Sequence, residues 1–278
     1  MDDLFGGIYL VSTLACTALI NLEFAKLDDV EFHNWEDVIG RGRSGRIEAW
    51  RLLTCFLYAG KFGFNVLIGL HLMTQISARY ETMGPICTTR RRRDDDVGGW
   101  PYRSRGTSSD YAFALLLGMI GILLGQALLL PKLPAFVASQ GMHHRNFHRH
   151  LKFYVLYVWS KQRPHHRVNL FGVTMIAAYL PYAYLLIAYA LNNGEFIPVD
   201  MLHGMLVGHV YYYLACVVPR VTDGRMTVLS TPTALVDVCD WLEGRVGGMA
   251  GGGDDIGGMG NGRVEQPALA DVDGVIGG

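Results

Sequence analysis

Apolar residues gather into long stretches separated by polar segments, and they are not spread evenly along the chain. Five stretches come close to the about 20 residues that a helix needs to cross a bilayer. They are Ile8–Leu22, Phe62–Ile76, Tyr111–Leu130, Leu170–Leu191 and Met201–Val218. A shorter apolar segment, Leu151–Trp159, lies between the third and the fourth. This pattern predicts an all-α membrane protein.

The stretches predict six membrane helices. Pro131 is expected to end the third and Pro219 the sixth, because proline cannot continue a regular helix. Pro181 lies inside the fifth, where neighbouring helices can satisfy the freed carbonyl. The expected helices are Phe5–Leu22, Phe62–Ala78, Tyr111–Leu130, one built around Leu151–Trp159, Asn169–Leu191 and Met201–Val218. Together they predict one transmembrane domain over residues 1–242.

The composition supports this view and sets the C-terminal segment apart. Half of the residues are hydrophobic and only 18% are charged, against about 25% charged residues in soluble domains. After Gly244 the chain becomes rich in glycine and has few apolar residues to offset the cost of ordering. Residues 243–278 are therefore expected to form a disordered, glycine-rich tail. The net charge of −1 gives no reason to expect a nucleic-acid partner.

Basic residues in the loops predict the orientation in the membrane. Six helices place both termini on one side, and cytosolic loops carry an excess of lysine and arginine. The second and fourth loops contain Arg90–Arg93, Lys161, Arg163 and Arg167. This bias favours cytosolic termini, although Lys26, directly after the first helix, favours the opposite orientation.

Several short segments resemble one known family. The Trp50-Arg51 pair in the first loop is a mark of the rhomboid superfamily, and the surrounding Ala49–Glu81 is similar to derlins. Further matching segments follow in order: Asp110-Tyr111, Tyr157-Val158-Trp159, Tyr179-Leu180-Pro181, Gly204–His209 and Leu229–Pro232. The resemblance to derlins, which are rhomboid-like proteins, covers about residues 8–242.

The resemblance implies a fold, a compartment and a function. The fold would be a six-transmembrane-helix rhomboid-like bundle in the endoplasmic reticulum (ER) membrane. The chain would act in ER-associated degradation, binding misfolded ER proteins and assisting their retrotranslocation to the cytosol. Its partners would be an ER ubiquitin ligase complex, a cytosolic AAA unfoldase and membrane lipids, with no cofactor. The tail lacks the aromatic-Gly-x-Gly stretch by which several derlins recruit the unfoldase.

The residues needed for rhomboid proteolysis are missing. A rhomboid protease uses a serine where the fourth helix opens and a histidine three residues before the first glycine of Gly-x-x-x-Gly. Counting back from Gly204 gives Met201, which cannot accept a proton, and His148–His150 at the expected opening contains no serine. We expect no enzyme. The alternatives are an active intramembrane serine protease and a small-solute transporter, for which an internal repeat is expected.

Two motifs are candidates for structural roles. Gly204 and Gly208 lie four residues apart on one helix face, where small residues allow another helix to approach closely. The resemblance implies that this other helix is the fourth. It also gives Trp50 and Arg51 a structural role in the first loop.

Polar residues within the expected membrane helices are candidates for a functional groove. Such residues are costly in a bilayer and usually face protein or water. They could line a hydrophilic groove that admits a polypeptide, or they could form hydrogen bonds between helices. The candidates are Asn65, His71, Gln75, Gln126 and His209. His143, His144, His148 and His150 were also considered as metal ligands, but no carboxylate or cysteine accompanies them, so we expect no metal site.

Overall fold

The computed structural model describes residues 4–32, 48–82, 108–129, 132, 146–170, 173–191, 198–222 and 228–250. A few side chains within these ranges, including that of Asn65, lie outside the description. The chain divides into two units, Met1–Asp240 and Trp241–Gly278. The helices that correspond to the expected membrane spans all belong to the first unit.

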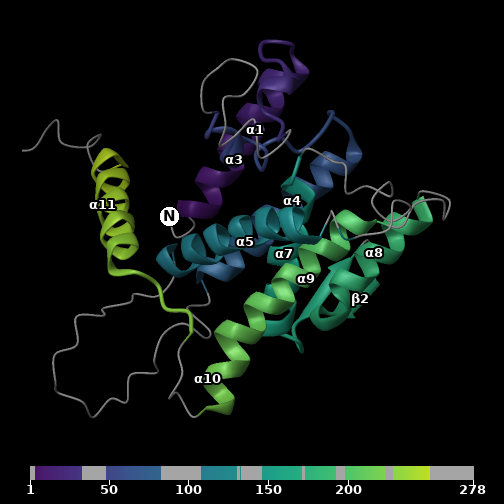
Figure 1. Ribbon diagram of the computed structural model, residues 1–278, viewed down its shortest axis with the longest axis vertical. Coiled ribbons are helices and arrows are strands. Elements are labelled where there is room, and N and C mark those ends of the chain that lie inside the picture. Colours follow the sequence, from purple (N-terminus) through teal and green to yellow (C-terminus); the bar gives the residue numbers. More distant parts are fainter. Residues whose placement is uncertain are drawn as a thin grey trace, which may run out of the picture. The chain divides into compact units, whose positions relative to one another are not determined.

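Helices dominate the described residues (Figure 1). They are α1 (Leu4–Asn21), η1 (Leu27–Asp29), α3 (Arg51–Thr54), α4 (Phe64–Thr82), α5 (Ser108–Leu129), α7 (His148–Gln162), η3 (Ala177–Tyr179), α8 (Leu180–Leu191), α9 (Val199–Tyr212), η4 (Tyr213–Val217), α10 (Val218–Val221) and α11 (Thr233–Ala250). Strands β1 (Arg167–Leu170) and β2 (Val173–Ile176) form an antiparallel hairpin. Each expected membrane segment thus contains a helix, and α9, η4 and α10 follow one another without a break.

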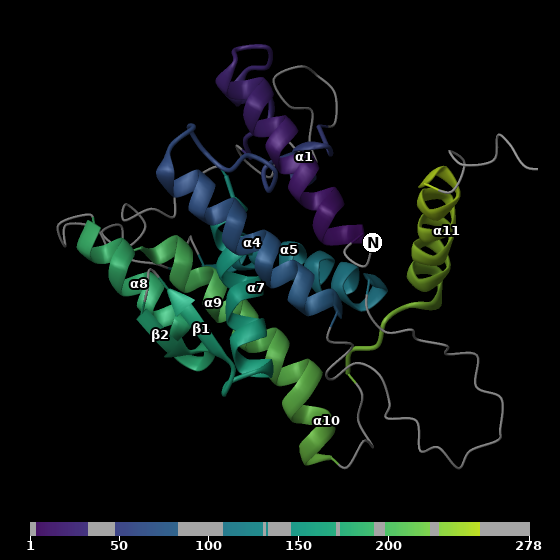
Figure 2. The same cartoon turned by 180° about the vertical axis from the view of Figure 1, so that it is seen from behind.

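Helix α7 is the central helix of the bundle, and α4, α5, α8 and α9 all pack against it (Figures 1 and 2). Every residue from Phe153 to Ser160 is buried. Its ends are polar and its apolar run is short, which is why the sequence pattern marked it only weakly. A helix enclosed by other helices does not need a continuous apolar surface, because its polar residues face protein instead of lipid.

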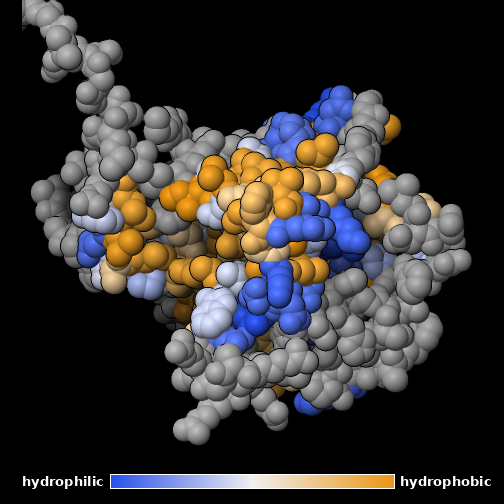
Figure 3. All heavy atoms as spheres, turned by 90° about the horizontal axis from the view of Figure 1, so that it is seen from above, coloured by the Kyte–Doolittle hydropathy of each residue, from blue (hydrophilic) through white to orange (hydrophobic). Residues whose placement is uncertain are grey.

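Other helices present apolar surface to their surroundings. Among the described residues, two helical stretches are long and apolar enough to cross a membrane, Ser109–Leu128 and Val199–Val221, and two shorter ones are Gly6–Asn21 and Ala177–Ala190. Large hydrophobic side chains are exposed on several helices, for example Val11, Leu128 and Leu186. Figure 3 shows such side chains covering broad areas of one face of the molecule. Apolar patches of this extent are typical of a surface that lipid or another protein covers.

The prediction of a fifth helix over Asn169–Leu191 is wrong for the first part of that range. There the chain forms the β1–β2 hairpin, in which Val168 pairs with Met175 and Leu170 with Val173. Branched residues such as Val173 and Ile176 favour strands, but they also belong to the long apolar run Leu170–Leu191, which resembles a membrane helix. The helix α8 begins only at Leu180. Pro181 is therefore in its first turn, where a missing N–H costs no hydrogen bond.

The sixth helix continues past Pro219, contrary to expectation, and ends at Val221. The preceding residues, Tyr213–Val217, form a π-helical stretch, which is wider than an α-helix. Pro219 occupies the first turn of the segment that follows this stretch. The helix therefore bypasses the missing N–H of the proline instead of stopping at it. Near the C-terminus, α11 extends to Ala250, past Gly244, while residues 251–278 lie outside the described residues.

Candidate functional site

Gly204 and Gly208 lie where α9 crosses α7. A Cβ atom on Gly204 would overlap the carbonyl group of His150, whose carbon is 2.9 Å away. A Cβ atom on Gly208 would lie 3.1 Å from the carbonyl oxygen of Tyr154 and 3.3 Å from the Cβ of Tyr157. The residues of both helices meet in ascending order, so α7 and α9 run in the same direction. This is expected of two membrane helices separated by one other.

Three glycines of α5 extend this close packing, and the sequence analysis missed them. A Cβ atom on Gly118 would strike the ring of Tyr154, and one on Gly121 would lie 2.6 Å from Val207. One on Gly125 would strike the imidazole of His203. The spacing of these glycines, three and then four residues apart, places them on one helix face. That spacing was visible in the sequence and could have identified α5 as the third member of the contact.

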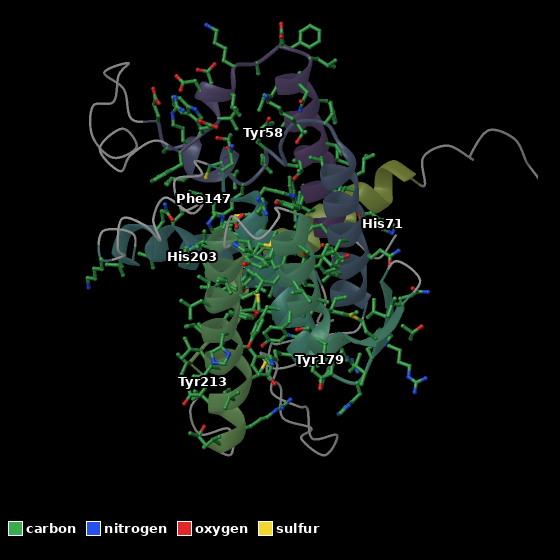
Figure 4. All side chains as sticks on the ribbon, turned by 90° about the vertical axis from the view of Figure 1, so that its right-hand side faces the viewer. Tyr58, His71, Phe147, Tyr179, His203 and Tyr213 are labelled. Carbon is green, nitrogen blue, oxygen red and sulfur yellow. The ribbon has the colours of Figure 1, made fainter. Side chains whose placement is uncertain are left out.

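The place where a rhomboid protease would hold its catalytic pair contains different chemistry. Met201 is buried and offers a thioether in place of a base. The α7 residue against Gly204 is His150, whose ring meets that of His203 edge to face at 5.3 Å. Figure 4 shows Phe147 and His203 near the same end of the bundle, with Tyr213 toward the other end. Met201 cannot act as a base, and His150 carries no hydroxyl, so the pair lacks the nucleophile that acyl transfer needs.

Arg51 organises the first loop, while its neighbour Trp50 is exposed. The buried guanidinium forms an ion pair with Glu48 and donates hydrogen bonds to the carbonyl oxygens of Asp28 and Glu31, the latter at 2.9 Å. Two carbonyl oxygens of one short segment and one carboxylate thus converge on the guanidinium of Arg51. A planar, always charged donor suits this arrangement, and lysine could not reproduce it.

The first loop is also bound to α1 and to the start of α7. The hydroxyl of Tyr9 donates to the carbonyl oxygen of Phe56 at 2.9 Å and lies 2.9 Å from Nδ1 of His148. The backbone N–H of Phe147 donates to the carbonyl oxygen of Cys55 at 2.8 Å. Burial raises the pKa of the Cys55 thiol to about 12, so it stays protonated and packs as a small apolar group. The described end of the loop, around Cys55 and Phe56, is therefore a fixed part of the bundle.

The candidate groove residues lie on three different helices. His71 and Gln75 are exposed on α4, where their side-chain nitrogens are 3.3 Å apart. Gln126 is buried on α5, and His209 is exposed on α9 with its Nδ1 2.9 Å from the hydroxyl of Tyr157. The side chain of Asn65, on α4, lies outside the described part. The structure thus pairs His71 with Gln75 and joins His209 to α7.

The exposed face of α4 contains a third polar residue beside His71 and Gln75. Thr74 is exposed and lies three residues after His71 and one before Gln75, so the three share one face. Its hydroxyl donates to the carbonyl oxygen of Leu70 at 2.8 Å. Figure 4 shows His71 at the periphery of the bundle. We call His71, Thr74 and Gln75 the α4 polar face.

Of the four histidines that were candidate metal ligands, His148 and His150 lie in the described residues, and their surroundings differ. His148 stacks against Tyr9, whereas His150 packs against Phe147 and His203. Within the described ranges, no group of three or more histidine, cysteine or acidic residues is placed to hold a metal ion. His143 and His144 lie outside these ranges.

Comparison with known proteins agrees with this geometry. The Der1-like family matches residues 5–233. Derlin-2.2 of Arabidopsis thaliana is 33% identical over 187 residues, which cover 67% of this chain and 66% of that protein. The probable derlin-2 homolog of Dictyostelium discoideum is 27% identical over 204 residues, 72% of this chain and 67% of that protein. Derlin-2 of Oryza sativa subsp. japonica is 32% identical over 187 residues, covering 67% and 65%.

The match to the first relatives thus spans slightly less than two thirds of their length. The family match over residues 5–233 includes the first loop, the central helix and the glycine contact. The predicted resemblance and the helical membrane fold are confirmed. The chain belongs to the Der1-like family, the derlins, which are catalytically inactive, rhomboid-like, multi-pass helical proteins of the ER membrane.

Proposed function

We propose that this derlin assists the retrotranslocation of misfolded ER proteins to the cytosol for degradation. Family membership supports this role, and the observation that carries the proposal is the α4 polar face. Three neighbouring polar side chains are exposed on a helix of a membrane bundle. Polar groups exposed in a bilayer are costly and mark a path for polar cargo or water.

The α4 polar face offers hydrogen bonds to a passing polypeptide. The imidazole of His71 and the amide of Gln75 both combine a donor and an acceptor, as a peptide group does. An extended segment of a misfolded protein could exchange its bonds to water for bonds to these groups. Because the face is lateral, the segment would enter from the side of the bundle and would not need a closed pore.

A short, outward-facing helix supports local thinning of the bilayer. Helix α8, on which Leu186 is exposed, has 12 residues, which correspond to about 18 Å along its axis. The hydrocarbon core of a bilayer is about 30 Å thick, and a shorter protein draws the surrounding lipid inward. A thinner layer lowers the barrier to a polar chain that passes along the α4 polar face.

The partners and the orientation belong to the same proposal. We infer that the termini lie in the cytosol, which places the basic residues Lys161, Arg163 and Arg167 on the cytosolic side. The chain would work with an ER ubiquitin ligase complex and a cytosolic AAA unfoldase.

The role of the α4 polar face can be tested in cells that lack the endogenous protein. A triple variant, His71→Leu, Thr74→Val and Gln75→Leu, replaces the polar groups by apolar ones of similar size. We expect a misfolded ER substrate to persist several-fold longer in a chase experiment, with the derlin itself at its normal level. The matched control is Leu67→Ile, an exposed apolar position on the same helix. Normal substrate turnover in the triple variant would refute this mechanism.

A further inference from the structure

The start of α7 carries a concentration of positive charge. Arg149 and Lys152 are three residues apart and therefore lie on one side of the helix. The first turn of α7 contains no acidic residue, and no side chain caps its N-terminus. The positive end of the helix dipole adds to the two cationic side chains instead of opposing them. This arrangement favours a bound anion.

One of the two cations has a counter-ion in the protein. Arg149 forms an ion pair with Asp200 at 3.0 Å, and Asp200 lies in the first turn of α9. The aspartate is almost completely buried, whereas the arginine side chain is 42% exposed. Part of the guanidinium fork of Arg149 therefore faces outward, where it can bind a second anionic group.

Lys152 has no such counter-ion. Its ammonium group lies against α4, 3.0 Å from the position that a Cβ atom on Gly69 would occupy. It is within electrostatic range of Arg149 and Asp200, but among the described residues no carboxylate is within ion-pair distance of it. Two cations and one anion leave one positive charge uncompensated.

The position of this charge in the membrane indicates what compensates it. Asp200 is at the beginning of the apolar stretch Val199–Val221, and the start of α7 lies beside it. Arg149 and Lys152 are therefore close to one end of a membrane-spanning helix, at the depth of lipid headgroups. A basic pocket between membrane helices at this depth suits a phosphate group.

We propose that Arg149 and Lys152 bind the phosphate of a membrane phospholipid where α4, α7 and α9 meet. The guanidinium of Arg149 supplies paired N–H donors that match phosphate oxygens, and Lys152 supplies a point charge. A lipid is favoured over an acidic peptide because the charge is uncompensated in the protein alone, and headgroups are always present at this depth. Inorganic phosphate has the same chemistry and is separated from the lipid by experiment. This binding site is independent of the proposed retrotranslocation.

Native mass spectrometry of the full-length protein in detergent, titrated with dioleoyl phosphatidic acid, tests the site. Lys152→Gln removes the uncompensated charge and leaves the Arg149–Asp200 ion pair intact. We expect it to weaken the tightest lipid-binding event about tenfold, which corresponds to about 1.4 kcal/mol, because one charge-assisted contact is lost. The matched control is Arg163→Gln, an exposed basic residue just beyond the other end of α7, which should retain the lipid as the wild type does.

A second measurement identifies the source of the phosphate. Phosphatidic acid should raise the melting temperature of the wild type more than that of Lys152→Gln, and inorganic phosphate at the same concentration should have little effect. Equal lipid retention by the wild type and Lys152→Gln would overturn the proposal, as would equal loss in Arg163→Gln. Equal stabilisation by inorganic phosphate, or displacement of the lipid by a poly-glutamate peptide, would show that the occupant is not a phospholipid.

Discussion

The contact of α9 with α7 and the outer face of α4 are built in opposite ways. At the α7–α9 contact the important residues, Gly204 and Gly208, have no side chains, and backbone meets backbone. On the α4 polar face the important residues have polar side chains that are exposed. The first region determines how closely two helices approach, and the second determines what the surface offers to other molecules.

This difference follows from the physics of packing in a membrane. Lipid chains are as apolar as leucine, so helices associate through close packing and not through exclusion of water. A glycine contact is therefore sensitive to added volume. The exposed face of α4 contributes little to packing, so substitutions there should alter function with little change in stability.

The largest effect is expected for Gly204→Leu. Its Cβ atom alone would overlap the backbone carbonyl of His150, and a backbone atom in a buried helix cannot turn aside as a side chain can. The two helices would have to separate, with loss of the contacts along their whole length. We expect little folded protein, measured as the monodisperse fraction in size-exclusion chromatography after detergent extraction.

A matched control for this variant is Leu206→Ala, on the outer side of the same helix, where Leu206 is exposed. It changes side-chain volume without touching α7, so the yield of folded protein should stay near that of the wild type. Normal folding of Gly204→Leu would show that α7 and α9 are not held as close as the overlap of Gly204 with the His150 carbonyl indicates.

A smaller effect is expected for Gly208→Ala. The added Cβ would meet the Tyr154 carbonyl oxygen at 3.1 Å and Tyr157 at 3.3 Å, which requires a shift of only a few tenths of an ångström. Overpacking of this kind costs about 1–3 kcal/mol. The variant should fold with a lowered melting temperature. A loss of stability as large as that of Gly204→Leu would contradict the finding that α7 lies closer to Gly204 than to Gly208.

Substitutions of Met201 test whether this position has only a packing role or also a chemical one. It is buried, so removing its side chain would leave a cavity and would confuse the test. Met201→Leu conserves volume and should cost less than about 1.5 kcal/mol, with unchanged turnover of ER substrates. Met201→His restores a base three residues before Gly204, yet it should give no labelling by a fluorophosphonate, because the opposing α7 residue is His150. Labelling of a serine in α7 would disprove this.

The apolar runs in the sequence predicted where the helices lie. The prediction failed where an apolar run forms strands instead of a helix, and where a helix continues past a proline. The stretch around Val168–Ile176 is apolar enough for a membrane helix, but its branched residues form a hairpin. Pro219 was expected to end a helix, but the π-helical stretch before it allows the helix to continue. Hydrophobicity alone does not distinguish these cases, because the outcome depends on backbone hydrogen bonding.

The site was less predictable than the fold, because its contacts join residues that are far apart in sequence. The Gly204–Gly208 spacing indicated a close helix contact, but the three glycines of α5 on the same bundle were overlooked. The contacts of His150 with His203 and of Arg149 with Asp200 depend on how α7 and α9 are rotated. No local pattern specifies that rotation, so these pairs could not be read from the sequence.

The smallest effect on stability is expected for the triple variant of the α4 polar face. His71 and Gln75 bond each other, and Thr74 bonds the carbonyl of its own helix, so the substitutions leave no other element without a partner. Exposed substitutions of this kind change stability by about 0.5 kcal/mol or less, so the melting temperature in detergent should match that of the wild type. Combined with slower substrate turnover in cells, this result would assign the face a function without a structural role. A melting temperature lowered as far as in Gly208→Ala would mean that the face packs against another part of the bundle, and the contrast between the two regions would fail.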